Sequence, residues 1–186
     1  LIVHSRYVAA EYCRTFGPPR DMWVVPHGDY TFFRTAGMSS SQATDATPSP
    51  QATPLLRETR TRARRSLGVS EDAVVFLFAG YMRPYKGVDV LCRAWPLAVG
   101  MGLPPESLLI MVGSVSPEVA PLLDTLESAA GERVRIVRRY VSSSTLAHYL
   151  EAADAVVAPY HKCFTSGIVP LAFSFGLPVI ATRVGA

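Results

Sequence analysis

The sequence predicts an α/β protein whose second half is a doubly wound parallel sheet. Between residues 71 and 186, short apolar runs alternate with segments in which apolar residues recur every three or four positions, which is typical of alternating strands and helices. The first run, residues 73–79, is apolar throughout, as expected of a central strand covered on both faces. The short segments between these units favour repeated βα connections in one sheet.

The apolar pattern gives each element in order. Strands are predicted at residues 73–79, 108–112, 134–137, 155–158 and 178–181. Helices are predicted from about residue 87, with Pro96 kinking or ending the helix, and then around residues 119–126, 146–153 and 168–175. Gly176 is the expected cap of the last helix.

The first 36 residues predict the end of a separate α/β domain. They read as a strand at residues 1–3, a helix from the N-cap Ser5 through Phe16, and a strand at residues 22–25. Residues 37–54 consist mostly of Ser, Thr, Gln, Ala and Pro, so we expect a flexible linker there and a second domain over residues 55–186. Because the chain opens inside an apolar run and stops just after a strand, we expect it to be cut at both ends.

Composition indicates the cellular location and the kinds of ligand to expect. A net charge of +3 suits an anionic ligand but is small for a dedicated nucleic-acid binder. Five arginines between residues 57 and 65 predict a solvated helix closed by Gly68, rather than a nucleic-acid arm. The cysteines, Cys13, Cys92 and Cys163, are odd in number and lack C-x-x-C spacing, so we expect a reduced, cytoplasmic protein. No apolar stretch reaches the roughly 20 residues of a membrane span, and no signal peptide is visible.

The loop after the first predicted strand of this domain is the strongest candidate for a binding site. Its sequence, G-Y-M-R-P-Y-K-G from Gly80 to Gly87, places Arg83 and Lys86 at the start of a helix. Cations are electrostatically unfavourable at a helix N-terminus unless an anion joins them. Either side chain alone could simply be solvated, but the flanking glycines let the backbone approach a ligand closely. Together these features predict a phosphate site.

A second candidate loop follows the fourth predicted strand of this domain, at residues 159–170. Proline is tolerated in the first turn of a helix, so Pro170 predicts that the amides of Ser166, Gly167 and Ile168 lie at the open N-terminus. These amides would form a second anion site. His161 and Lys162 are secondary candidates because they can add positive charge nearby.

The two loops together resemble the retaining glycosyltransferases of family 4. The resemblance rests on G-Y-M-R-P-Y-K-G and on S-G-I-V-P-L-A-F-S-F-G-L-P-V-I-A-T from Ser166. It implies a GT-B enzyme with two Rossmann-like domains, in which the C-terminal one holds most of a nucleotide-sugar donor. Residues 1–36 would then close the N-terminal, acceptor-side domain.

The resemblance also implies roles and partners. Lys86 and Arg83 would be the catalytic residues, binding the donor diphosphate and stabilising its developing charge. Donor-binding positions would be Gly80, Tyr81, Gly87, Tyr140, Val141, Ser166, Gly167 and Ile168. The implied acceptor is a carbohydrate or lipid-linked molecule, with no metal or other cofactor, no nucleic acid, and peripheral membrane contact through the N-terminal half at the cytoplasmic face.

The sequence departs from the family pattern at three positions. The arginine that usually follows the first glycine is Tyr81 here, and Arg83 is the available substitute. The family's two glutamates are replaced by Cys163 and Leu171. A retaining transfer in which the leaving phosphate acts as base does not need those carboxylates.

Two functions other than sugar transfer stay open, and a third is excluded. A non-catalytic nucleotide-sugar-binding relative and, more weakly, a nucleotide-sugar epimerase of similar fold stay open. A nicotinamide-dependent oxidoreductase is excluded because no G-x-G-x-x-G follows the first strand of the sheet.

Overall fold

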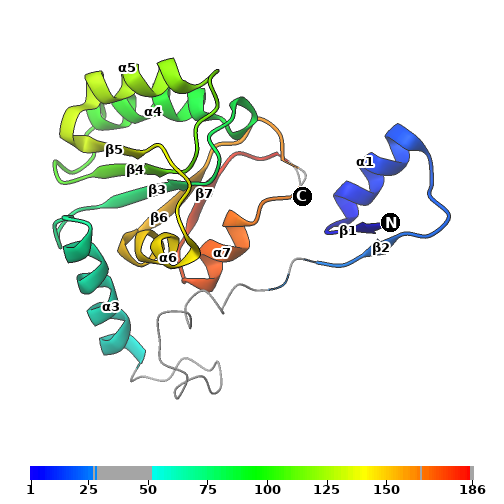
Figure 1. Ribbon diagram of the computed structural model, residues 1–186, viewed down its shortest axis with the longest axis horizontal. Helices are drawn as coiled ribbons and strands as arrows, with labels where there is room; N and C mark the ends of the chain where they lie inside the picture. The colour runs from blue at the N-terminus through cyan, green and yellow to red at the C-terminus, as the bar shows by residue number, and fades with distance from the viewer. Residues whose placement is uncertain (27, 29–51, 164, 185–186) are drawn as a thin grey trace.

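A five-stranded parallel sheet forms the centre of the molecule (Figure 1). The computed structural model describes residues 1–26, 28, 52–163 and 165–184. In the order β5-β4-β3-β6-β7, the strands are Val134–Val137, Leu108–Val112, Val75–Ala79, Ala155–Ala158 and Val179–Ala181. The predicted α/β class and the parallel sheet are therefore confirmed.

The strand order creates a switch point beside β3. The chain runs outward from β3 through β4 to β5 and then crosses back to place β6 on the other side of β3. Val75 is paired with Leu108 on one side, and Phe76 with Ala155 on the other. In doubly wound sheets, ligands bind beyond the carboxyl ends of the strands at such a point. The loops that leave β3 and β6 flank this crevice.

Helices cover both faces of the sheet. The helices are α3 (Ala52–Ser66), α4 (Val88–Gly100), α5 (Ala120–Ala130), α6 (Ser143–Ala152) and α7 (Ile168–Ser174), with short 3-10 turns η1 (Pro84–Lys86) and η2 (Gly131–Arg133). Figure 1 shows α4 and α5 over one face and α6 and α7 over the other, with α3 beside α6.

The two faces of β3 explain why its sequence is apolar throughout. Leu77 packs with Leu150 of α6 in one buried cluster. Phe78, the next residue, packs with Leu91 of α4 in the other. Successive side chains of a strand point to opposite faces, so both faces of a doubly covered strand must be apolar.

Two expectations about element boundaries need correction. Pro96 does not end α4, which continues to Gly100; Val99, beyond the proline, packs against the core and offsets the missing amide donor. The helix α3 begins at Ala52, inside the expected linker of residues 37–54. Residues 37–51 of that linker lie outside the described residues.

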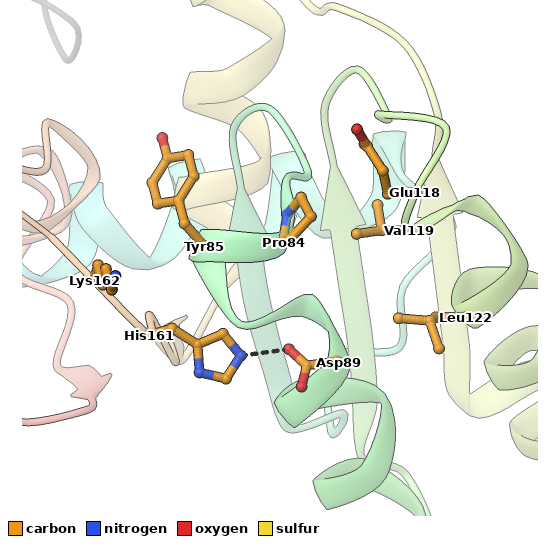
Figure 2. Close-up of a pocket in the computed structure, with 8 residues that line it drawn as sticks. All are labelled: Pro84, Tyr85, Asp89, Glu118, Val119, Leu122, His161 and Lys162. Atoms are coloured by element: carbon orange, nitrogen blue, oxygen red, sulfur yellow. Dashed lines mark hydrogen bonds and ion pairs between the residues drawn. The ribbon is translucent and has the colours of Figure 1, made fainter.

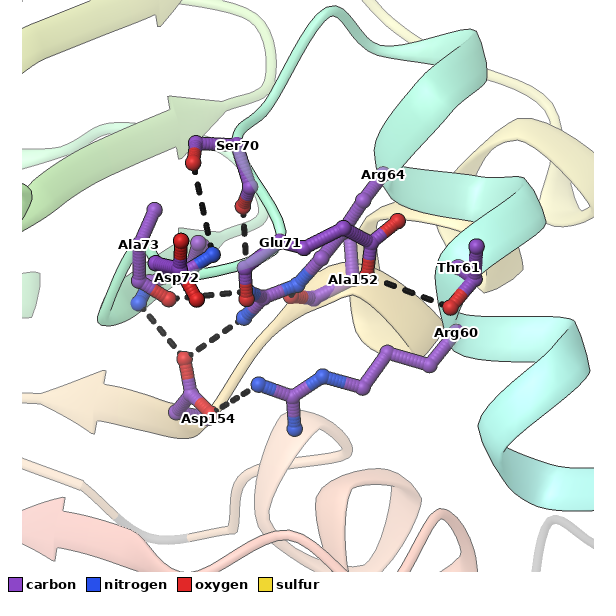
Figure 3. A network of polar contacts seen from close by, with 10 residues as sticks. Arg60, Thr61, Arg64, Ser70, Glu71, Asp72, Ala73, Ala152 and Asp154 are labelled. Carbon is purple, nitrogen blue, oxygen red and sulfur yellow. Dashed lines mark hydrogen bonds and ion pairs between the residues drawn. The ribbon is translucent and has the colours of Figure 1, made fainter. Parts of the chain in front are cut away.

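The sequence predicted that the arginine-rich helix α3 is solvated, but one of its arginines is buried. Arg64 is completely buried and donates to the carbonyl oxygens of Ala152 (3.1 Å) and Ala73 (2.9 Å), and to Asp154 (2.8 Å). Asp154 also pairs with Arg60 (Figure 3). It accepts from the Val75 amide at 2.7 Å. Arg64 thus joins α3 to the amino ends of β3 and β6.

The N-terminal segment forms a small unit of its own. Strands β1 (Ile2–Val3) and β2 (Trp23–Val24) pair in parallel around α1 (Arg6–Phe16). The Ser5 side chain caps α1 by accepting from the Val8 amide at 3.2 Å, as predicted. Among the described helices, none is long and apolar enough to cross a membrane.

Candidate functional site

The loops after β3 and β6 pack against each other at the carboxyl edge of the sheet. The Tyr85 carbonyl accepts from the His161 amide at 2.9 Å and from the Lys162 amide at 3.4 Å. The Tyr85 and Tyr160 rings meet edge to face with their centroids 6.5 Å apart. The structure therefore brings the two candidate loops into one site.

Lys86 belongs to the loop after β3, and its side chain lies near Tyr160 of the loop after β6. Its Nζ is 5.4 Å from the centroid of the Tyr160 ring, and it lies so close over Gly80 that a Cβ there would approach it to 2.8 Å. Within the described part of the chain, no carboxylate forms a salt bridge with Lys86. Burial lowers the pKa of Lys86, and the nearby charge of Arg83 lowers it further, while Cys163 has the opposite effect. An anionic ligand would relieve this unpaired charge.

Close backbone packing fixes the β3 loop. Gly87 has a left-handed φ of 69°, and a Cβ there would lie 1.7 Å from the Pro159 carbonyl oxygen. A Cβ on Gly113, after β4, would lie 2.0 Å from the Gly80 carbonyl oxygen. Sequence analysis did not identify Gly113, although its position directly after the apolar run of residues 108–112 is a visible signal. These glycines are required by the site's shape.

Tyr160 connects Lys86 to the start of α7. The side chain is buried, its hydroxyl accepts from the Ser166 hydroxyl at 3.2 Å, and burial raises its pKa. Its own proton stays free to be donated. Gly167 is the N-cap of α7 and Ile168 the first helical residue, so this helix begins where Pro170 predicted.

His161 and Lys162 line a separate pocket of about 470 Å³ on the α4 side (Figure 2). His161 Nε2 lies 2.6 Å from Asp89 Oδ1, which joins the β6 loop to the first turn of α4. Val119 and Leu122 form an apolar wall opposite. His161 is therefore an anchor between elements, and Lys162 lies on the rim.

Arg83 does not share the surroundings of Lys86. Its guanidinium carbon lies 4.3 Å from the centroid of the exposed Tyr81 ring, and it lines another pocket with Ser116 and Glu118. The charges of Arg83 and Lys86 still interact. The structure thus brings Lys86, Gly80, Gly87 and Tyr160 together but leaves Arg83 facing elsewhere.

The remaining predicted positions differ in their burial and surroundings. Tyr140 is 81% exposed, while Val141 packs against the core. Leu171 is a buried residue of α7 that packs in the core, whereas Cys163 lies close enough to Lys86 to interact electrostatically. In the described ranges, no three His, Cys, Asp or Glu side chains gather in a way that could hold a metal ion.

A doubly wound parallel sheet with a lysine at its switch point, without a salt bridge to a described carboxylate, is typical of the class of α/β domains that bind anionic ligands such as nucleotides. Its family is more specific. Residues 73–186 match the family described as "Glycosyl transferases group 1", and the chain belongs to this family.

Similar proteins agree with this family. D-inositol 3-phosphate glycosyltransferase of Xylanimonas cellulosilytica is 31% identical over 190 aligned residues, which cover all of this chain and 40% of that protein. Sucrose-phosphate synthase of Thermosynechococcus elongatus has a TM-score of 0.70 at 22% identity, covering 99% of this chain and 40% of that one. Anabaena HepE, solved in complex with UDP-glucose, has a TM-score of 0.68 at 19% identity, covering 99% and 44%. The chain thus spans about 40% of the length of such relatives, and the likeness to solved structures confirms the GT-B fold.

Proposed function

We propose that the full-length protein transfers a sugar from a nucleotide-sugar donor to an acceptor. The observation that carries this proposal is Lys86, a partly buried ammonium without a carboxylate partner among the described residues, at the switch point of a glycosyltransferase-family domain. A buried charge without a partner is costly. The donor diphosphate supplies the missing partner.

Lys86 has the chemistry needed for departure of a nucleoside diphosphate. Negative charge grows on the diphosphate as the glycosidic bond breaks, and a fixed cation stabilises that charge more strongly in the transition state than in the bound donor. The Tyr160 hydroxyl is held by Ser166 with its proton free, so it is a second donor at the same place.

The finer features of the reaction belong to the same proposal. We propose retention of configuration, as in family 4, with a departing phosphate oxygen as the base that deprotonates the acceptor. This route needs neither a metal nor the carboxylates that Cys163 and Leu171 replace. A carbohydrate or lipid-linked acceptor, membrane contact through the N-terminal half and a cytoplasmic setting stay predictions.

A nucleotide-sugar-binding protein without transfer is the second candidate. The observation that favours it is Leu171, which is 5% exposed and packs in the apolar core at the place of a family glutamate. No carboxylate from that position can hold the ribose hydroxyls. Binding and turnover must therefore be measured separately.

A donor screen on the full-length protein tests the proposal. Thermal shift and calorimetry with UDP, GDP and ADP sugars should identify one donor that stabilises the wild type in proportion to its concentration. The Lys86→Ala variant should bind that donor more weakly, while Arg65→Ala, on the exposed side of α3, should bind it as the wild type does. Donor binding without product in an acceptor screen would favour the binding protein, and no binding of any donor would refute both.

A further inference from the structure

A second pocket, of about 420 Å³, lies between the loops that follow β3 and β4. Tyr81, Arg83 and Tyr85 line it from the first loop, and Ser116 and Glu118 from the second. Lys86 does not line this pocket. This second pocket shares Pro84, Tyr85 and Glu118 with the pocket shown in Figure 2.

The backbone of this pocket is preformed. The Met82 amide donates to the Ser114 carbonyl at 2.8 Å, and the Ser116 amide donates to the Met82 carbonyl at 3.0 Å. Met82 is itself fully buried and forms a parallel bridge with Val115. Residues on both sides of Met82 are therefore held in place before any ligand arrives.

Among the described residues, its polar groups keep hydrogen-bonding capacity for a ligand. Arg83 lies over the Tyr81 ring and forms no salt bridge with a described carboxylate. The Ser116 hydroxyl and, more weakly, the Arg83 charge lower the pKa of Glu118, so both lie near its carboxylate. The Ser116 hydroxyl is nevertheless buried and completes no hydrogen bond of normal geometry with the described residues. A ligand between Arg83 and Glu118 could use all three groups.

The opposite charges of Arg83 and Glu118 indicate which class of ligand fits this pocket. An anion would be repelled by Glu118 and a cation by Arg83, so a neutral ligand with several donors and acceptors fits better than a phosphate. A pyranose has such hydroxyl groups around its edge and an apolar face of C–H groups that packs against aromatic rings. Tyr81 and Tyr85 offer that aromatic surface, and both are 40–45% exposed.

We propose that this pocket binds a pyranose unit of the acceptor, with Arg83 and Glu118 bonding its hydroxyls and the tyrosines packing on its face. This inference rests on the proposed function, because only a glycosyltransferase needs an acceptor saccharide here. The donor sugar is attached to the diphosphate at Lys86, which lies outside the pocket. We therefore assign the pyranose in the pocket to the acceptor rather than to the donor.

Saturation-transfer NMR on the full-length protein tests the pocket. The probes are methyl α-D-glucopyranoside, methyl α-D-mannopyranoside and methyl β-D-galactopyranoside, with uridine and inorganic phosphate as competitors. Arg83→Gln, Glu118→Gln and Ser116→Ala remove the polar groups one at a time. Arg65→Gln and Glu106→Gln make the same changes at exposed positions outside the pocket. UDP-glucose, GDP-mannose and ADP-glucose binding is measured on the same samples.

At least one pyranoside should bind the wild type and bind roughly ten-fold more weakly to Arg83→Gln and Glu118→Gln, since each loses a hydrogen bond to a charged group. The control variants should bind it normally, and Glu118→Gln and Ser116→Ala should bind the donor as the wild type does. The proposal is overturned if no pyranoside binds, if the variants bind it as well as the wild type, or if uridine or phosphate displaces it. Failure of every donor to bind, with the pyranoside pattern intact, would instead refute the donor site and leave the pocket supported.

Discussion

Arg64 and Lys86 are buried or partly buried cations at opposite edges of the same sheet, and their surroundings differ in kind. Arg64, at the amino ends of β3 and β6, donates to backbone carbonyls and to Asp154 (Figure 3). Lys86, at the carboxyl edge, has the Tyr160 ring nearby but no described carboxylate in a salt bridge. Burial lowers the pKa of both groups. The protein satisfies the first cation itself, whereas the proposed function assigns the second to a ligand.

The largest expected effect is the loss of stability when the hydrogen bonds and ion pair of Arg64 are removed. Arg64→Met fills similar volume but leaves the Ala152 and Ala73 carbonyls, and part of Asp154, without donors. Breaking a buried ion pair by removing one partner costs about 3–5 kcal/mol. We expect a loss of that size in the free energy of unfolding of the full-length protein, measured by denaturant titration.

The matched control is Arg62→Met on the same helix. Arg62 pairs with Glu58 on the surface at 3.2 Å, and such pairs contribute less than about 1 kcal/mol. Equal losses in the two variants would show that the helix itself, rather than the buried network, determines the effect.

The next largest expected effect is a loss of turnover when the Lys86 side chain is removed. Lys86→Ala should lower the turnover number at saturating donor by roughly 100- to 1,000-fold, the usual cost of removing one group that stabilises developing charge. The melting temperature should stay the same or rise, because burial of the ammonium disfavours its charged form in the free protein. A collapsed melting temperature, or an unchanged rate, would make Lys86 a second structural cation and remove the contrast.

Sequence alone predicted the sheet better than it predicted these two cations. Periodicity reports which residues are buried along an element, so the strands Leu108–Val112 and Val134–Val137 were found with correct bounds. It cannot report which arginine of a charged helix turns inward, because Arg64 is buried through bonds to residues up to 90 positions away. Lys86 was proposed because helix-end electrostatics is local to the sequence, and its role stays a prediction.

The sequence likewise could not predict how the side chains of the β3 loop are oriented. Arg83 and Lys86 are three residues apart, yet they line different surroundings. Met82, just before Arg83, is bridged to Val115, and that pairing depends on how β3 and β4 align. Gly113 is part of the same alignment, so its role also emerged only from the structure.

A smaller effect tests whether the carboxyl edge has a structural requirement of its own. Gly113→Ala places a Cβ 2.0 Å from the Gly80 carbonyl oxygen and strains a positive φ of 150°. We expect a loss of about 1–3 kcal/mol in unfolding free energy, together with weaker donor binding as Gly80 shifts. Gly100→Ala, with open space around it at the end of α4, should be neutral or slightly stabilising. A neutral Gly113→Ala would show that the loop is loosely held.

The smallest expected effect comes from the His161–Asp89 pair that joins the β6 loop to α4. Partial burial alone would raise the pKa of Asp89, but the hydrogen bond and charge of His161 outweigh it and lower that pKa. A carboxyl with a lowered pKa binds fewer protons when folded than when unfolded, so its stabilisation is present at neutral pH and is lost as the pH falls through the folded value, below 3.8.

The Asp89→Asn variant should therefore be less stable than the wild type at pH 7, by less than about 1 kcal/mol because the side chain is about a third exposed. The difference should shrink as the pH is lowered below 4. Unfolding titrations between pH 3 and 7 would measure it, with Asp72→Asn at an exposed position as the control. A difference that stayed constant with pH would mean that Asp89 stabilises the fold by packing rather than by its charge. The His161–Asp89 ion pair would then contribute nothing to the stability of the carboxyl edge.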